Sequence, residues 1–395
     1  MNRKVIGTVV PLDYLSIQGG ASQRIKADLA ALIYGGYDVD VIFPSHANQL
    51  AHCLPSKLTP TTYRSIQRVK FLPEKMKLLF DMYTQIINPF FGLALQKRCG
   101  SYSVIIAHFP WSVAASYRVV KNKIPLVFVA HNFEYGLVRQ VTRNPLIRWF
   151  TYCVEKYACQ KATRILCTSQ YDMKALEAAY EIPAAKLALL PNHVDIDFYS
   201  QTHTLYDKVT ERQKLGFDRS SLLLLFHGRM DYIPNVDALK FVLNELVPTL
   251  REVGANTGIV VAGARIPKWC FRYRSEVVSF YSDVPDMRRF LSVADAVIVP
   301  LSVGGGTRLK ILESFAARVP VISTAKGAEG IDCQDGCHIL IAQNNANDFI
   351  NKLKIFAENE SLQQKLIRNA YELVVQKHSI LVASRILQET IRFPN

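Results

Sequence analysis

Short apolar segments alternate with helical segments along almost all of this 395-residue chain. In the first half, KVIGTVVPL, YDVDVIFP, SVIIAHFP, IPLVFVAHN and ATRILCTS have the composition of buried strands, and segments such as SQRIKADLAALIYGG have helical spacing. The second half repeats the scheme with SLLLLFHGRM, GIVVAGA, DAVIVPL and PVIST. Strands that alternate with helices form parallel sheets with both faces covered. The pattern therefore predicts an α/β fold of two Rossmann-like domains with a cleft between them, in which ligands bind at the carboxyl ends of the strands.

The length also favours two domains of similar size. We expect an N-terminal domain over residues 1–200 and a C-terminal domain over 201–375. Residues 203–220, polar with a basic bias, have the composition of a hinge. Residues 376–395 are expected to form a C-terminal helix, a candidate to pack back on the first domain.

Charge and cysteine content exclude several classes of protein. The formal charge is +14, with 23 Lys/Arg against 13 Asp/Glu in residues 1–200 and 24 against 20 in the rest. No RNA-binding signature, zinc finger or basic zipper accompanies this excess, so we expect no nucleic-acid partner. The eight cysteines include no CxxC pair, the N-terminus lacks a signal peptide, and no segment is long and apolar enough to span a membrane. We expect a cytoplasmic protein with reduced thiols and no metal site.

A glycine loop stands between the strand DAVIVPL and a short helix ending near Val319-Pro320. Gly304, Gly305, Gly306 and Thr307 offer backbone amides at a helix N-terminus, and Arg308 and Lys310 add full positive charges. This arrangement favours an anion. The contiguous glycines fit neither the Walker loop nor the dinucleotide motif, so ATP hydrolysis and NAD chemistry are not supported.

Other strand ends carry candidate ligand contacts, each with a structural alternative. Gly19 and Gly20 follow the first strand and would admit a phosphate or sugar, or simply form a tight turn. Arg229, after Gly228, suits a phosphate, or an ion pair with Asp231.

A carboxylate and two histidines complete the candidate set. Glu313 either faces solvent, which its helical position alone favours, or accepts hydrogen bonds from a vicinal diol. His108 and His131 end successive strands, where a histidine binds substrate or transfers a proton, although a structural role is commoner for either one alone. The segment Asn192-His193-Val194-Asp195 suits an Asx turn at a domain boundary.

Taken together, these segments resemble the retaining GT-B glycosyltransferases of family 4, in the branch that carries the GGGTRLKILE variant and acts on bacterial surface glycans. The resemblance rests on GGGTRLKILESFAARVPVIST, GRMDYIPNVDAL, PNHVD and KGAEGI, in the family's order. It is strongest from Phe226 to Ile341. It implies two Rossmann-like domains and transfer of a hexose from a nucleoside-diphosphate sugar.

The resemblance also assigns roles to individual residues. It implies that Glu313 holds the ribose hydroxyls, that amides from Thr307 to Leu309 receive the diphosphate, and that Arg229 contacts the donor. It places His131 beside the transferred sugar. Gly19 and Gly20 match the first glycine loop, and Gly228, Gly305 and Gly306 belong to the donor-side loops.

Two positions depart from the family pattern. Gly305 stands where the first glutamate of the E-x7-E motif is expected, and the lysine expected shortly after Arg229 is missing from DYIPN. In the GGGTRLK form, Arg308 and Lys310 are implied to supply the charge. The implied reaction retains the anomeric configuration and needs no metal or cofactor, because amides, Arg229, Arg308 and Lys310 stabilise the departing diphosphate.

The acceptor is expected to be a cell-surface glycan or a lipid-linked glycan. The segment from Lys57 to Lys77 holds six Lys/Arg and one Glu, and an apolar stretch follows it. This suits an anionic membrane surface, or equally a solvated face beside a core helix. Two other functions stay open: a GT-B nucleotide-sugar-binding protein without turnover, and a sugar-nucleotide epimerase on the same fold.

Overall fold

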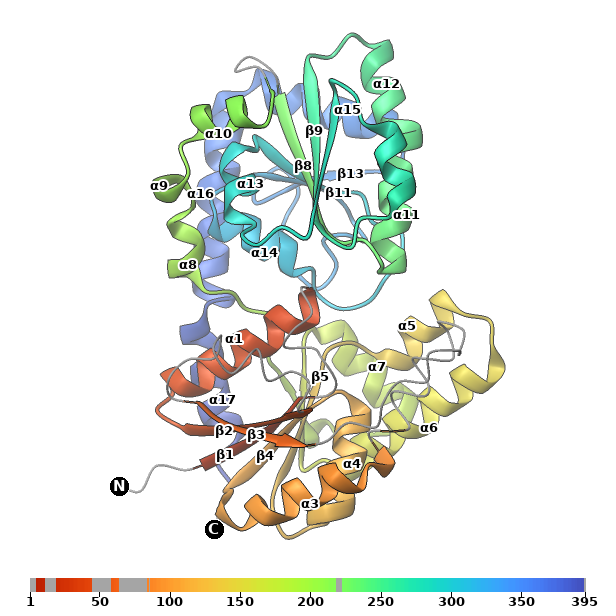
Figure 1. The fold of residues 1–395 in the computed structure, drawn as a ribbon, viewed down its shortest axis with the longest axis vertical. Helices are drawn as coiled ribbons and strands as arrows, with labels where there is room; N and C mark the ends of the chain where they lie inside the picture. The colour runs from red at the N-terminus through yellow and green to blue at the C-terminus, as the bar shows by residue number, and fades with distance from the viewer. Residues whose placement is uncertain are drawn as a thin grey trace. The chain divides into compact units, whose positions relative to one another are not determined.

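The structure is a computed structural model that describes residues 5–10, 19–44, 58–63, 84, 86–217 and 222–393. Contacts divide the chain into two units (Figure 1). Unit 1 is Met1–Pro191 with Ile380–Asn395, and unit 2 is Asn192–Ser379.

Unit 1 is built on a seven-stranded sheet in the order β3-β2-β1-β4-β5-β6-β7, in which every pairing is parallel. Its strands are β1 (Val5–Val9), β2 (Asp38–Pro44), β3 (Leu58–Tyr63), β4 (Val104–His108), β5 (Leu126–Ala130), β6 (Arg164–Cys167) and β7 (Leu187–Leu189). In the described part of unit 1, the helices of eight or more residues are α1 (Gly20–Tyr34), α3 (Pro89–Arg98), α4 (Pro110–Val120), α5 (Glu134–Val141), α6 (Pro145–Lys161), α7 (Gln170–Tyr180) and α17 (Ile380–Thr390). The strand order reverses direction between β1 and β4, which makes this edge the switch point where ligands bind in such sheets.

The strands of unit 1 are apolar throughout because both faces of the sheet are buried. Successive residues point to opposite faces, so Ile105 packs in one hydrophobic cluster while Val104 and Ile106 pack in the other. Helices α1 and α17 contribute to the second of these clusters. The C-terminal helix thus packs on α1, with Ala383 and Leu387 buried (Figure 1).

Unit 2 repeats the design with a six-stranded parallel sheet in the order β10-β9-β8-β11-β12-β13. The strands are β8 (Leu222–Arg229), β9 (Thr257–Ala264), β10 (Val278–Ser282), β11 (Ala296–Val299), β12 (Val321–Thr324) and β13 (Leu340–Ala342). The helices used below are α8 (Ile196–Ser200), α9 (Thr202–Leu205), α10 (Lys208–Lys214), α11 (Ile233–Phe241) and α14 (Leu309–Ala316). Here the order reverses between β8 and β11.

The hinge expected at residues 203–220 is wrong for its described part, 203–217. Leu215 and Phe217 pack in the hydrophobic core of unit 2, and Arg212 donates a 2.5 Å hydrogen bond to Asp295. By contacts, the chain passes between the units at Pro191–Asn192 and at Ser379–Ile380. The sequence had ended the first domain at residue 200 and the second at residue 375.

Two further expectations concern cysteines and membranes. The seven cysteines among the described residues are free thiols, and Cys53 lies outside them. No helix within the described ranges has the length and apolar character to cross a bilayer. Most of the basic segment Lys57–Lys77 lies outside the described residues, whereas α3, which follows it, buries Phe91 and Leu95 in the core.

Candidate functional site

The predicted anion site lies at the switch point of unit 2. Gly228 and Arg229 end β8, and the glycine loop leads from β11 into α14. Because β8 and β11 are neighbours and parallel, their carboxyl ends lie at the same edge of the sheet. The structure therefore places Gly228, Arg229 and the glycine loop at one edge of the unit 2 sheet, whereas Gly19 and Gly20, also predicted to bind the donor, lie in unit 1.

Glycine is required at two of these positions by close approach of cationic side chains. Gly228 has φ +144° and Gly304 has φ +124°, both unfavourable for other residues. A Cβ on Gly228 would lie 2.9 Å from Nζ of Lys310, and a Cβ on Gly304 would lie 2.8 Å from Nη2 of Arg308. The glycines thus leave room for the two cations to fold back against the backbone.

Lys310 lies in the first turn of α14 but points across to the end of β8. Its ammonium donates to the carbonyl of His227 at 2.5 Å and to Oδ1 of Asn235 at 3.0 Å. Burial, with a smaller contribution from Arg308, lowers the pKa of Lys310 to about 7. At neutral pH a fraction of the Lys310 side chains is therefore unprotonated, and a bound anion would favour the protonated form.

Asn235 is a site residue that sequence reasoning missed. It stands six positions after Arg229, in the region where the family pattern expects a lysine. Its Oδ1 accepts from Lys310, and its Nδ2 donates to the carbonyl of Arg229 at 2.9 Å. Asn235 therefore joins the ammonium of Lys310 to the donor-side loop.

The side chain of Arg308 folds back and hydrogen-bonds to the backbone of the glycine loop. Its Nη1 donates to the carbonyls of Gly305 and Gly306, the latter at 2.7 Å, and its side chain is buried. The amides at the start of α14 donate no hydrogen bond to the side chain of the N-cap residue, Arg308. Arg308 thus braces the loop that leads to this helix N-terminus.

Arg229 forms the ion pair that the sequence gave as its alternative role. Nε and Nη2 of Arg229 contact the carboxylate of Asp231 at 2.5 and 2.7 Å, and Arg265 contacts the same carboxylate at 2.7 Å. The two arginines hold the pKa of Asp231 below its usual value against the opposing effect of burial. Arg265, which follows β9, was not identified from the sequence.

Glu313 is buried, so the interpretation that it faces solvent is wrong. Burial raises the pKa of Glu313, and the hydroxyl of Tyr199 on α8 opposes this shift. Thr307 is held by a second interaction that the sequence did not predict. Its carbonyl accepts from Nδ2 of Asn192 at 2.8 Å. Asn192 therefore supports the glycine loop and does more than form a turn, the structural role expected for it.

In unit 1, the predicted residues lie at the edge where β1, β4 and β5 end. Gly20 begins α1, and Gly19 is its N-cap with an extended backbone. Residues 11–18, which precede them, are outside the described residues. His131 follows β5, is 8% exposed, and is 3.1 Å from His108 between Nε2 and Nδ1.

A buried ion pair between Arg24 and Asp28 lies next to His108 and was not predicted from the sequence. Nε of Arg24 is 2.8 Å from Oδ2 of Asp28, and the same oxygen is 3.9 Å from Nδ1 of His108. Arg24 also donates to the carbonyl of Leu190 at 2.9 Å. An arginine and an aspartate four apart on an otherwise apolar helix face are the only sequence signal for this group.

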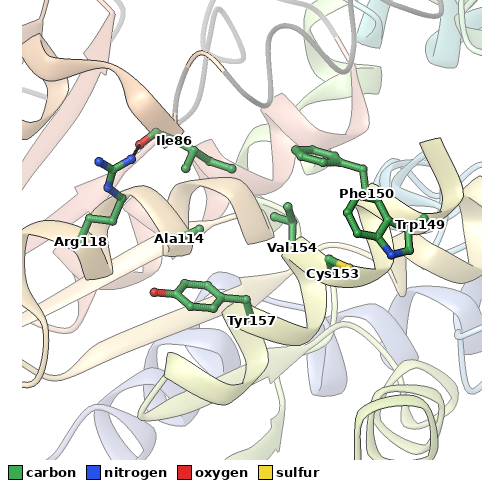
Figure 2. Close-up of a pocket in the computed structure, with 8 residues that line it drawn as sticks. All are labelled: Ile86, Ala114, Arg118, Trp149, Phe150, Cys153, Val154 and Tyr157. Atoms are coloured by element: carbon green, nitrogen blue, oxygen red, sulfur yellow. Dashed lines mark hydrogen bonds between the residues drawn. The ribbon is translucent and has the colours of Figure 1, made fainter. Parts of the chain in front are cut away.

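A cavity of about 370 Å³ in unit 1 contains none of the predicted site residues (Figure 2). It lies between α4 and α6, and Arg118 at its edge donates to the carbonyl of Ile86 at 3.1 Å. The other lining side chains are mostly apolar: Ala114, Trp149, Phe150, Cys153, Val154 and Tyr157. Within the described residues, no group of three or more His, Cys, Asp or Glu side chains is arranged to hold a metal ion.

Comparisons with known proteins concern the family of the chain. Residues 18–198 match the model of Glycosyltransferase Family 4, and residues 221–359 match that of Glycosyl transferases group 1. The chain belongs to these glycosyltransferases. The coarse form of the family resemblance is therefore confirmed for both units.

The curated relatives are distant. A D-inositol 3-phosphate glycosyltransferase from Nocardioides sp. is 24% identical over 302 residues, which cover 69% of this chain and 63% of that protein. A lipopolysaccharide 1,2-N-acetylglucosaminetransferase from Salmonella typhimurium is 27% identical over 277 residues, 64% of this chain and 69% of that protein. The match thus spans less than two thirds of the first relative's length.

A solved structure confirms the fold. The Anabaena protein Alr3699/HepE, in complex with UDP and glucose, has a TM-score of 0.74 at 13% identity, covering 98% of this chain and 99% of that one. The expectation of two Rossmann-like domains of the GT-B class is confirmed. At this identity the likeness extends to the fold alone.

Proposed function

We propose that this glycosyltransferase transfers a hexose from a nucleoside-diphosphate sugar to a glycan or lipid-linked acceptor, with retention of configuration and without a metal or cofactor. The observation that carries the proposal is the site in unit 2, where glycine backbone and Lys310 meet the N-terminus of α14. Such a group of donors suits a diphosphate, which bears negative charge before and after the bond to the sugar breaks.

In this proposal the diphosphate occupies the amides from Thr307 to Leu309, and the ammonium of Lys310 neutralises it. Gly305 and Gly306 allow the close approach, and Arg308 keeps the loop in place. Glu313 accepts hydrogen bonds from the ribose hydroxyls. Its burial supports this role, because a buried carboxylate gains from additional donors.

Arg229 binds the donor only when its guanidinium leaves the carboxylate of Asp231 and contacts a phosphate of the donor. Asp231 is shared with Arg265, so Asp231 keeps one partner if Arg229 moves. His131 in unit 1 contacts the transferred sugar, near Gly19 and Gly20. We further propose a cytoplasmic protein that reaches its acceptor at the inner face of an anionic membrane, which the basic excess of residues 1–200 supports.

The test is nucleotide release from UDP-glucose, UDP-N-acetylglucosamine and GDP-mannose, with and without membrane extract, each in the presence of a metal chelator. We expect release from one donor only when extract is present, insensitive to the chelator, and a product with the donor's anomeric configuration. Lys310→Met should lower release, while Lys240→Met, which removes an exposed cation from α11, should not.

Three outcomes would contradict the proposal in different ways. Binding without release under every condition would identify a nucleotide-sugar-binding protein without turnover. A changed sugar nucleotide without acceptor would identify an epimerase. Loss of release with the chelator, restored by added magnesium, would refute metal independence alone.

A further inference from the structure

Two histidines from adjacent strands share one hydrogen bond inside unit 1. His108 is the last residue of β4, and His131 follows β5 directly. Nδ1 of His108 is 3.1 Å from Nε2 of His131. A single proton lies between these atoms when both rings are neutral, so one ring must donate and the other accept.

Both rings are neutral at physiological pH. Burial lowers the pKa of His108 to about 4, with Asp28 opposing and Arg24 adding to the effect. Burial also lowers the pKa of His131 well below its ordinary value, with further contributions from His108 and Arg24. The arrangement therefore depends on which tautomer each neutral ring adopts.

The surroundings of His108 decide the direction of the bond. Its Nε2 is buried and has no hydrogen-bond partner among the described residues. A proton there would be a buried N–H without an acceptor, which is rarer and costlier than a lone pair without a donor. Oδ2 of Asp28, 3.9 Å from Nδ1, also attracts a proton to Nδ1. His108 therefore carries its proton on Nδ1 and donates it to His131.

This direction leaves His131 with its own proton on Nδ1. That atom makes no hydrogen bond to a described residue and is not among the fully buried polar atoms. The ring plane is fixed by stacking on Phe109, with centroids 4.2 Å apart and planes 5° from parallel. Phe109 in turn stacks on Trp111 and has φ +71°, a strained value for a bulky residue.

We propose that His108 is a positioning residue that fixes His131 as the Nδ1–H tautomer, so that His131 presents a hydrogen-bond donor to an oxygen atom of the substrate. This rests on the proposed function for the identity of that substrate, a sugar hydroxyl or a developing alkoxide. The assignment excludes His131 as the base that removes the acceptor's proton, because the accessible nitrogen already carries a proton and Nε2 is engaged by His108.

The first test reads the tautomer directly in the full chain labelled with 15N-histidine. Two-bond 1H–15N correlations distinguish protonated from unprotonated ring nitrogens, and His108→Asn and His131→Gln assign the two spin systems. We expect both rings to be Nδ1–H tautomers. A protonated Nε2 on His131 would overturn the proposal, and this readout does not depend on any enzymatic activity.

The second test uses a matched pair of variants. Asparagine at position 108 keeps an N–H donor near the place of Nδ1, whereas leucine of similar size keeps none. We expect His108→Leu to release His131 into a mixture of tautomers and to lower turnover of the donor at least about tenfold, because a donor to the reacting oxygen is lost in part of the population. His108→Asn should restore the Nδ1–H tautomer and most of the turnover.

The two arms separate the inference from the function on which it rests. If the wild-type chain turns over none of the donors, the proposed function fails, and the spectra still decide the tautomer. If turnover is present and falls equally in the asparagine and leucine variants, with His131 still in the Nδ1–H form in both, His108 does not act through the tautomer of His131. Thermal melts of both variants show whether either loss comes from unfolding.

Discussion

Replacing Lys310 with methionine tests the anion site most sharply. Methionine keeps an apolar stem beside the ring of Phe226, whose centroid is 5.3 Å from the lysine ammonium, and removes only the charge and its hydrogen bonds. A hydrogen bond to a charged group contributes about 1.5–3 kcal/mol. We therefore expect Lys310→Met to weaken binding of a nucleotide sugar roughly tenfold to a hundredfold.

The pH dependence of binding adds a signature that a structural lysine would not give. With a pKa of about 7, Lys310 is mostly charged at pH 6 and mostly neutral at pH 8. An anion binds the charged form, so affinity should fall as pH rises through 7, by up to about tenfold over two pH units. The adjacent His227 has a pKa lowered by burial to about 3 and does not titrate in this range.

The assay is calorimetric titration with UDP-glucose, whose diester diphosphate has no proton to lose between pH 6 and 8. Wild type should show the decline, Lys310→Met a flat and weaker profile, and Lys240→Met the wild-type profile. Binding by Lys310→Met within about twofold of wild type, while Lys240→Met behaves the same, would refute the assignment of Lys310 to the diphosphate. A flat wild-type profile would refute the link between its titration and binding.

Three other substitutions test the fold and the site. Gly263→Ala should lower the free energy of unfolding in urea by about 3 kcal/mol or more, because Gly263 has φ +150° and a Cβ there would lie 1.9 Å from the carbonyl oxygen of Gly228. The control Gly254→Ala should cost about 1 kcal/mol, because Gly254 has φ +62° and open space around it. Leu387→Ala should cost about 3 kcal/mol because this α17 side chain is 1% exposed against α1; equal stability to wild type would deny that the C-terminal helix is part of unit 1. Glu313→Gln should lower UDP-glucose affinity about tenfold with little change in melting temperature, and the opposite pattern would make this carboxylate structural.

The sequence predicted the two sheets because buried parallel strands have a period and composition that few other elements share. DAVIVPL contains β11 and PVIST contains β12, and the glycine loop was correctly expected between them. The hinge was misplaced because polar composition does not reveal that Leu215 and Phe217 are buried. Polar helices that cover a core on one side look like linkers in a single sequence.

From the sequence, the candidates in unit 2 were the glycine loop with its cations, Glu313, and Gly228 and Arg229 at the end of β8. The glycine loop and its cations share one segment, but Asn235 lies in the first turn of α11 and Arg265 follows β9. Their hydrogen bonds are set by strand order, which periodicity does not encode. The sequence also could not predict which histidine donates the hydrogen bond between His108 and His131, because this depends on the groups around each ring nitrogen.

The lysine that the family pattern places shortly after Arg229 is absent from this chain. Asn235 stands in the expected region, yet an ammonium group lies beside it, supplied by Lys310 seventy-five positions later. That lysine opposes the dipole of α14 by lying in its first turn, and it lies near Arg308, which lowers its pKa further. Glu313 offsets part of this effect by raising the pKa of Lys310. An anion that binds beside this half-buried lysine would stabilise its charged form further. The family pattern specifies a position in the chain, whereas the proposed diphosphate site requires a positive charge at a position in space, and Lys310 on α14 supplies that charge.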